Sequence, residues 1–195
     1  MSVRLFVKIV ALAVVYYLAA RLGLRYASIG HSISLVWPPT GIALAALVVL
    51  GFGAWPGVAI GAFLANAATP VPLATAGFIA VGNTLEAILA AAILIRAAGP
   101  RPRMDAMVAV RALVTSSAPL GALVSALIGV TALALSGALP SSAAASAVAV
   151  WWTGDLLGAL VIAPLLLAWA LGPPSTASAT PVGGQTSEML CPIEA

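Results

Sequence analysis

Long apolar stretches, separated by short breaks of polar residues, proline and glycine, dominate the chain. A helix that crosses a bilayer needs about 20 mostly apolar residues. Six stretches fit this description: about Leu5–Leu22, His31–Leu50, Ala54–Ala68, Leu73–Ala97, Val108–Leu135 and Ala147–Leu171. The pattern therefore predicts an all-α fold, a polytopic integral-membrane helix bundle with about six transmembrane helices.

The composition supports a membrane-embedded chain. Hydrophobic residues make up 63% of the sequence and charged residues only 7%, and the mean hydropathy is +1.16. A soluble domain carries about 25% charged residues. The net charge of +3 comes from few charges and does not indicate nucleic-acid binding. With one histidine, His31, and one cysteine, Cys191, we expect no disulfide framework, no metal site and no cofactor.

The two ends of the chain differ from the middle. Arg4 and Lys8 precede an apolar run, as in a signal peptide, but Leu18-Ala19-Ala20 is a poor cleavage site and further spans follow. We therefore expect a first transmembrane helix. After Leu171 the sequence is rich in proline, serine, threonine and glycine, which cannot bury a core. Residues 1–171 are thus predicted as the membrane-embedded domain and residues 172–195 as a disordered tail.

Basic residues predict the orientation, because Lys and Arg concentrate in cytoplasmic loops. With the N-terminus in the cytoplasm, six basic residues lie inside: Arg4, Lys8, Arg96, Arg101, Arg103 and Arg111. Only Arg21 and Arg25 then lie outside. Six spans return the C-terminus to the cytoplasm. The fifth span is overlong, and we expect residues 105–115 to lie at the membrane interface, followed by a kink at Pro119.

Several spans carry residues that a simple apolar bundle does not need. With this orientation they converge on the outer half of the bilayer, and the candidate sensing or ligand-binding residues are Trp37, Pro38, Pro39, Thr40, Asn66, Asn83, Glu86 and Asp155. The two prolines remove backbone donors, so the segment must be covered by protein or line a cavity. Acids inside a membrane cost several kcal/mol and are usually functional. The candidates predict a polar pocket.

Each candidate also has a structural interpretation. Glu86 and Asp155 can be neutral groups that tie helices together, with hydrogen bonds from Asn66, Asn83, Thr40, Thr84 or Thr153. Trp55-Pro56 is typical of an interface anchor followed by a first-turn proline, and Trp151 and Trp152 are expected in the outer aromatic belt. Small residues recur every fourth position and predict close helix packing: Gly53, Gly57, Gly61 and Ala65.

Four motifs occur in an order that resembles a known family. They are Ser34-Leu35-Val36-Trp37-Pro38-Pro39-Thr40-Gly41, Trp55-Pro56-Gly57 with Gly61-Ala62-Phe63-Leu64-Ala65-Asn66, Gly82-Asn83-Thr84-Leu85-Glu86, and Trp151-Trp152-Thr153-Gly154-Asp155 before Ala163-Pro164. Residues 125–130 also fit the fifth span of this family. The set is similar to the first of the membrane-associated sensor families (MASE, type one) of bacteria, from about Leu5 to Leu171.

The resemblance implies a sensory input module in the bacterial inner membrane. Members usually have about eight spans and precede cytosolic histidine kinases, diguanylate cyclases or phosphodiesterases, which implies a role in two-component or cyclic di-GMP signalling. This chain departs from the pattern in having six spans and a low-complexity tail, so a truncated, frameshifted or stand-alone input domain all fit.

The expected partners are the lipid bilayer and either a small ligand or a companion membrane protein. A homodimer is left open, and no nucleic acid is expected. No enzyme motif is present, so we expect no catalytic activity. The alternative function is a small membrane transporter or its substrate-binding component, because buried acids and broken helices are also typical of carriers.

Overall fold

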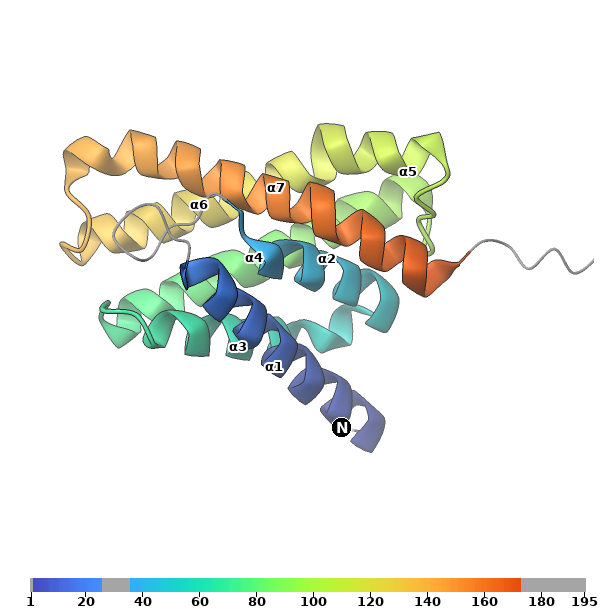
Figure 1. The fold of residues 1–195 in the computed structure, drawn as a ribbon, viewed down its shortest axis with the longest axis horizontal. Coiled ribbons are helices and arrows are strands. Elements are labelled where there is room, and N and C mark those ends of the chain that lie inside the picture. Colours follow the sequence, from blue (N-terminus) through green and yellow to red (C-terminus); the bar gives the residue numbers. More distant parts are fainter. Residues whose placement is uncertain (1, 26–35, 173–195) are drawn as a thin grey trace, which may run out of the picture.

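A computed structural model describes residues 2–25 and 36–172, and in this part of the chain all regular structure is helical (Figure 1). His31, Cys191 and the predicted tail from residue 173 onward lie outside the described residues. The elements are α1 (Val3–Arg25), α2 (Pro38–Leu50), η1 (Phe52–Ala54), α3 (Trp55–Ala67), α4 (Leu73–Ala98), α5 (Met107–Ala112), η2 (Leu113–Ser117), α6 (Ala118–Leu135), η3 (Ser141–Ala143) and α7 (Ala144–Leu171).

Four helical segments are long and apolar enough to cross a membrane: α1, α4, the continuous run Met107–Leu135, and α7 with η3. The remaining two, α2 and α3, have 13 residues each. At 1.5 Å per residue they measure about 20 Å, less than the hydrocarbon thickness of about 30 Å. Four long and two short apolar helices confirm the predicted polytopic helix bundle.

The second helix begins later than the sequence pattern suggests. The expected span started at His31, but Val36 and Trp37 are not helical and α2 starts at Pro38. A helix start leaves its first N–H groups without intrahelical acceptors. Pro38 and Pro39 have no N–H, and the N–H of Thr40 donates to the Trp37 carbonyl (3.2 Å). The proline pair thus opens a helix inside the bundle rather than interrupting one, because it removes the donors that would lack partners.

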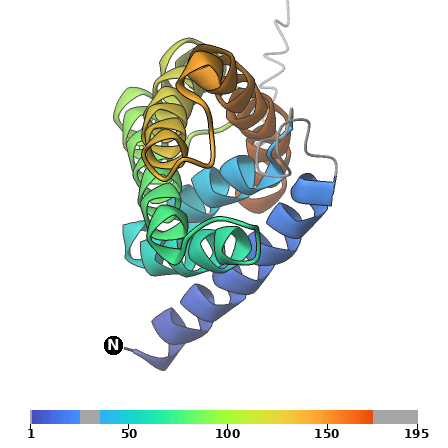
Figure 2. The ribbon, with the colours of Figure 1, turned by 90° about the vertical axis from the view of Figure 1, so that its left-hand side faces the viewer.

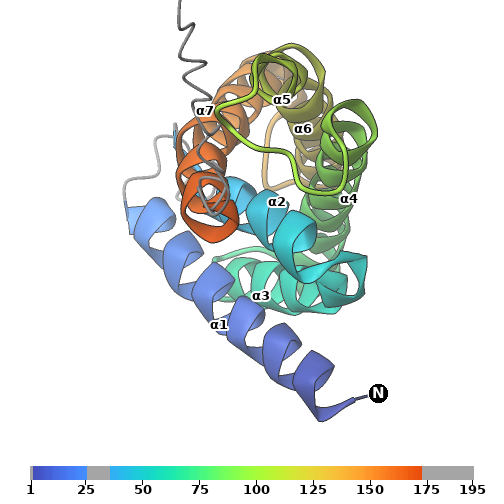
Figure 3. The same cartoon turned by 90° about the vertical axis from the view of Figure 1, so that its right-hand side faces the viewer.

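Helix α2 lies at the centre of the bundle. It packs against α7, α4 and α1, and Figure 3 shows it enclosed by these helices with α3 below. Eight of its 13 residues are buried. Trp37, Pro39 and Thr40 are among the buried residues, which confirms that protein covers the proline segment.

The bundle alternates in direction, so connections gather at two ends. The end that faces the viewer in Figure 3 holds the start of α1, the α4–α5 connection and the end of α7. The opposite end, seen in Figure 2, holds the α3–α4 and α6–α7 connections. The first end carries Arg4, Lys8, Arg96, Arg101, Arg103 and Arg111, and it is the end that the distribution of basic residues predicts to face the cytoplasm.

The fifth span is one continuous run with a π-helical turn inside it. The turn, η2, covers Leu113–Ser117 and ends just before Pro119. Proline cannot donate to the carbonyl four residues earlier, and a wider turn accommodates the missing bond. The irregularity therefore precedes Pro119, and the helix begins at Met107 rather than at Asp105. No observation places the first turns at the membrane interface, so that part remains a prediction.

Two glycines bring α3 close to α1. A Cβ on Gly57 would lie 2.6 Å from the Ile9 carbonyl oxygen, and one on Gly61 would lie 2.8 Å from the Ala13 carbonyl oxygen. The predicted small-residue stripe is confirmed at these two positions. At Gly53 a Cβ would meet only Leu5, at 3.6 Å, so that residue does not require glycine for packing. The close approach lets α1 bury Tyr16 against α3.

Candidate functional site

The start of α2 lies directly against the backbone of α7. The N–H of Trp37 donates to the Gly154 carbonyl (2.9 Å). A Cβ on Gly158 would lie 2.0 Å from the Trp37 carbonyl oxygen, and a Cβ on Gly41 would lie 2.4 Å from the Gly158 carbonyl oxygen. Only glycine fits these positions without movement of the backbone. The contact places the first turn of α2 beside the middle of α7.

This backbone contact brings Thr40 to Asp155. The Thr40 hydroxyl donates to Asp155 Oδ1 at 3.1 Å, and the two side chains are 5% and 1% exposed. The indole of Trp151, one turn earlier on α7, also adjoins Asp155. The N-terminus of a helix carries partial positive charge. The start of α2 therefore places a hydroxyl donor and the positive end of a helix beside Asp155.

Helices α4 and α6 supply the second half of the site. Asn83 and Glu86 lie one turn apart on the buried face of α4. The Ser125 hydroxyl, from α6, donates to Asn83 Oδ1 at 2.8 Å. The Glu86 carboxyl adjoins Asp155, Ser125 and Thr40. Four helices that are distant in the sequence thus meet at one polar point.

Tyr16 adds a fifth helix. It is 1% exposed, and its hydroxyl neighbours Trp37 and Asn83. It also lies near the carboxyl groups of Glu86 and Asp155. We name this group the polar cluster; its members are Tyr16, Thr40, Asn83, Glu86, Ser125 and Asp155.

The polar cluster contains atoms without partners. Buried Asn83 Nδ2, Glu86 Oε1 and Asp155 Oδ2 make no hydrogen bond in the described structure. Within the described ranges the ion pair found is Arg103 with Asp105, at an exposed site, and none involves the two buried acids. A buried polar atom without a partner costs about 1–3 kcal/mol, and more when charged. The cluster is therefore an expensive arrangement for a purely structural role.

The structure assembles most, but not all, of the predicted candidates. Thr40, Asn83, Glu86 and Asp155 meet in the polar cluster, and Trp37, Pro38 and Pro39 form the helix start beside it. Asn66 is buried, but its amide donates to the Ala62 carbonyl of its own helix (2.8 Å).

Two further predicted donors also bond within their own helices. The Thr84 hydroxyl donates to the Ala80 carbonyl, and the Thr153 hydroxyl to the Ala149 carbonyl. Among the hydroxyl donors proposed for the acids, the structure therefore supplies Thr40.

Sequence reasoning missed two members of the cluster. Ser125 lies in an apolar span rich in small residues, and serine is common in such spans, so it gives no signal of its own. Tyr16 lies in the first span, where a tyrosine in an apolar helix is a weak signal. Its distance from both helix ends could have marked it, because membrane tyrosines usually lie at the interface. Neither position could be paired with α4 without the fold.

The expected outer aromatic belt at Trp151 and Trp152 is wrong for Trp151. This side chain is 7% exposed and packs in the core with Ile79 and Val130. A Cβ on Gly129 would lie 2.4 Å from its ring, so the glycine of α6 makes room for it. Trp152 is half-buried, and its indole N–H donates to the Pro119 carbonyl (3.0 Å). Both tryptophans join α7 to α6.

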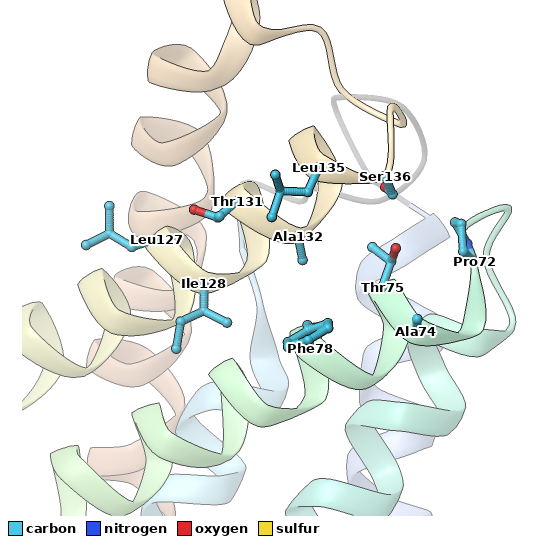
Figure 4. Close-up of a pocket in the computed structure, with 10 residues that line it drawn as sticks. All are labelled: Pro72, Ala74, Thr75, Phe78, Leu127, Ile128, Thr131, Ala132, Leu135 and Ser136. Carbon is cyan, nitrogen blue, oxygen red and sulfur yellow. The ribbon is translucent and has the colours of Figure 1, made fainter.

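A separate groove runs along the surface between the start of α4 and the end of α6. It measures about 640 Å³ and is mostly apolar, and Figure 4 shows Thr75 and Phe78 of α4 facing Ile128 and Ala132 of α6 across it. It contains none of the predicted candidates. An apolar groove on the outside of a membrane bundle offers contact to lipid chains, with few polar groups for recognition. The polar cluster is therefore the better candidate site.

Comparison with known proteins agrees with this architecture. The family model MASE1 matches residues 9–173, which covers most of the chain and every helix that contributes to the polar cluster. Neither the search of curated proteins nor the search of solved structures found a match. The chain is thus a multi-pass membrane protein that belongs to the MASE1 family of membrane-integral sensory domains of signalling proteins.

Proposed function

We propose that this chain is a sensory input domain of the bacterial inner membrane, and that its stimulus acts at the polar cluster. The stimulus is a small ligand or a companion membrane protein. The carrying observation is that five helices bring two carboxyl groups together in the bundle, with three polar atoms left without partners. Such expensive groups are retained inside membranes mainly where they serve function.

The cluster is placed where a change of occupancy alters helix packing. Thr40 joins α2 to α7, and Ser125 joins α6 to α4. A stimulus shifts a protein between two arrangements only by the difference in its affinity for them. If one arrangement satisfies Asn83, Glu86 and Asp155 better than the other, binding moves α7 relative to α2 and α4.

The end of α7 provides a route to a cytosolic output domain. Leu167 and Leu171 adjoin Arg103 and Asp105 of the α4–α5 connection at the cytoplasmic end. We propose that α7 transmits the change to a histidine kinase or diguanylate cyclase, within two-component or cyclic di-GMP signalling. In this scheme the chain itself catalyses no reaction and uses no nucleic acid.

A cyclase fusion tests the proposal. The complete chain is joined to a diguanylate cyclase output, and Glu86→Gln and Asp155→Asn are compared with the parent at equal membrane levels. Thr153→Val is the control, because the Thr153 hydroxyl donates to the Ala149 carbonyl of its own helix, away from the end of α7 that is proposed to transmit the change. We expect both cluster variants to alter cyclic di-GMP output severalfold and the control to leave it unchanged. Unchanged output from both cluster variants would remove the sensing site.

One observation also favours a transporter. A short helix whose N-terminus faces buried acids is typical of carriers with discontinuous helices, and α2 has this geometry. Vesicles that contain only this protein provide the test, with uptake of labelled substrates measured under a proton gradient. Gradient-driven uptake that Asp155→Asn abolishes would favour a carrier over the sensory proposal.

A further inference from the structure

The unpartnered atoms of the polar cluster have the chemistry of a ligand set. Glu86 Oε1 and Asp155 Oδ2 are acceptors, and both residues are at least nine-tenths buried. The Asn83 amide is the third member, with its Nδ2 free and its Oδ1 accepting from Ser125. A serine hydroxyl can donate or accept, so a turn of the amide by 180° keeps the Ser125 bond and presents the amide oxygen instead. The cluster then offers three buried oxygen atoms without hydrogen-bond partners.

When ionised, the two carboxyls have no basic partner in the described part of the chain. Two carboxyls adjoin each other, and the basic residues of the described chain lie toward the helix ends or in the connections. The partial positive charge at the start of α2 offsets only about half an elementary charge. A bound monovalent cation would both reduce the negative charge and satisfy the free oxygens.

We propose that the polar cluster binds a single alkali-metal ion, Na⁺ by size, through Glu86, Asp155, Asn83 and the Thr40 hydroxyl oxygen. The Thr40–Asp155 and Ser125–Asn83 bonds of 3.1 and 2.8 Å show that the side chains already touch, so the site suits an ion rather than an organic molecule. The assignment rests on the proposed function, because it names the ligand of the same site.

Other metal ions fit less well. Within the described part of the chain no group of three or more His, Cys, Asp or Glu residues gathers to hold a metal. Transition metals prefer imidazole and thiolate ligands, which the cluster lacks. Mg²⁺ loses its water shell reluctantly and needs near-ideal octahedral geometry. Carboxylate, amide and hydroxyl oxygens around one monovalent ion match the cluster better.

Binding is tested on the complete chain, purified in detergent or lipid nanodiscs. The radioactive ion ²²Na⁺ is bound at fixed pH and displaced by unlabelled NaCl, with choline chloride at equal concentration as the salt control. We expect saturable binding that choline does not displace. Asp155→Asn, Glu86→Gln and Thr40→Val should each raise Kd about tenfold or more, whereas Asp105→Asn should not.

One conservative variant and one thermal measurement keep the test independent of folding. Thr40→Ser retains the hydroxyl and should retain binding, and a saturable rise in unfolding temperature with NaCl should accompany binding in the parent. No Na⁺-specific binding or thermal shift would overturn the proposal. A thermal shift that depends on pH but not on Na⁺ would also overturn it, because protons alone would then neutralise the acids.

The cyclase fusion separates this inference from the function on which it rests. Suppose that the purified protein binds Na⁺, but that neither Na⁺ nor the cluster variants change the cyclic di-GMP output of the fusion. The ion site then stands and the sensory role fails. If the cluster variants change the output while no Na⁺ binds, the sensory role stands and the ion assignment fails.

Discussion

Two helix crossings in this bundle use glycine in the same way and yet differ in what they hold. At the α1–α3 crossing, Gly57 and Gly61 face the Ile9 and Ala13 carbonyl oxygens. At the α2–α7 crossing, Gly41 faces the Gly158 carbonyl oxygen and Gly158 faces the Trp37 carbonyl oxygen. The first crossing brings two regular helices together. The second brings the end of one helix against the middle of another, and it carries Thr40 and Asp155.

The difference shows why the polar cluster lies where it does. A regular helix satisfies its own backbone, so a crossing between two such helices needs only shape. A helix that starts inside the bundle must dispose of its free donors, and here Pro38 and Pro39 remove two of them. The same start then presents its positive end and the Thr40 hydroxyl to Asp155. Close packing at α2–α7 therefore positions two polar side chains of the cluster, Thr40 and Asp155, whereas close packing at α1–α3 mainly positions a helix.

The largest expected effect comes from Gly158→Ala. The added Cβ would lie 2.0 Å from the Trp37 carbonyl oxygen, against 2.6 Å at the Ile9 carbonyl oxygen for Gly57→Ala. Because both neighbours are backbone, neither can rotate away. We expect Gly158→Ala to cost about 3 kcal/mol or more and Gly57→Ala about 1–3 kcal/mol. The thermal unfolding midpoint in detergent measures both.

Gly77→Ala is the matched control for these variants. Nothing lies within 4 Å of a Cβ at this helical position of α4. Alanine stabilises a helix interior relative to glycine by about 1 kcal/mol, so a small rise in the midpoint is expected. Equal losses at Gly158 and Gly57 would contradict the ranking and make the two crossings equivalent.

The next effect compares two threonines. Thr40 donates to Asp155, and Thr84 donates to the Ala80 carbonyl of its own helix. Thr40→Val leaves a buried carboxyl oxygen without its donor, which costs about 1–3 kcal/mol. Thr84→Val removes a bond to a carbonyl that already accepts within its helix, and we expect about 0.5 kcal/mol or less. Denaturation followed by circular dichroism measures both variants, and a larger loss at Thr84 would show that Thr40 does not support the cluster.

The sequence predicted the helices better than their contacts. Hydrophobic length located α1, α3, α4, the continuous run Met107–Leu135 and α7 to within a few residues, because membrane helices require long apolar runs. It misplaced the start of α2, because His31–Leu50 is a long enough apolar run while the observed start depends on proline geometry and on the cover given by α7.

The candidate site was predictable only in part. Glu86 and Asp155 are conspicuous because acids are rare in apolar spans. Asn83 lies one turn before Glu86, and Thr40 directly follows the proline pair. The exclusion of Asn66 depends on which carbonyl its amide reaches, and the inclusion of Ser125 depends on the packing of α6 against α4. Neither the acceptor of the Asn66 amide nor the packing of α6 against α4 can be predicted from the local sequence.

The smallest expected effect concerns Asp105, whose carboxyl is exposed, in contrast to the buried carboxyls of Glu86 and Asp155. Arg103 donates to Asp105 through Nε (3.0 Å) and Nη2, and this hydrogen bonding lowers the pKa of the Asp105 carboxyl. A lowered pKa stabilises the folded state above the ordinary Asp pKa of about 4, and the contribution is lost as pH falls through the lowered value. Arg103→Gln should therefore reduce the unfolding midpoint slightly at neutral pH and not at all in strong acid. Because the pair is exposed, choline chloride should screen the difference away. A difference that persists in strong acid or in high salt would mean that Arg103 acts through packing against the end of α7 rather than through its charge.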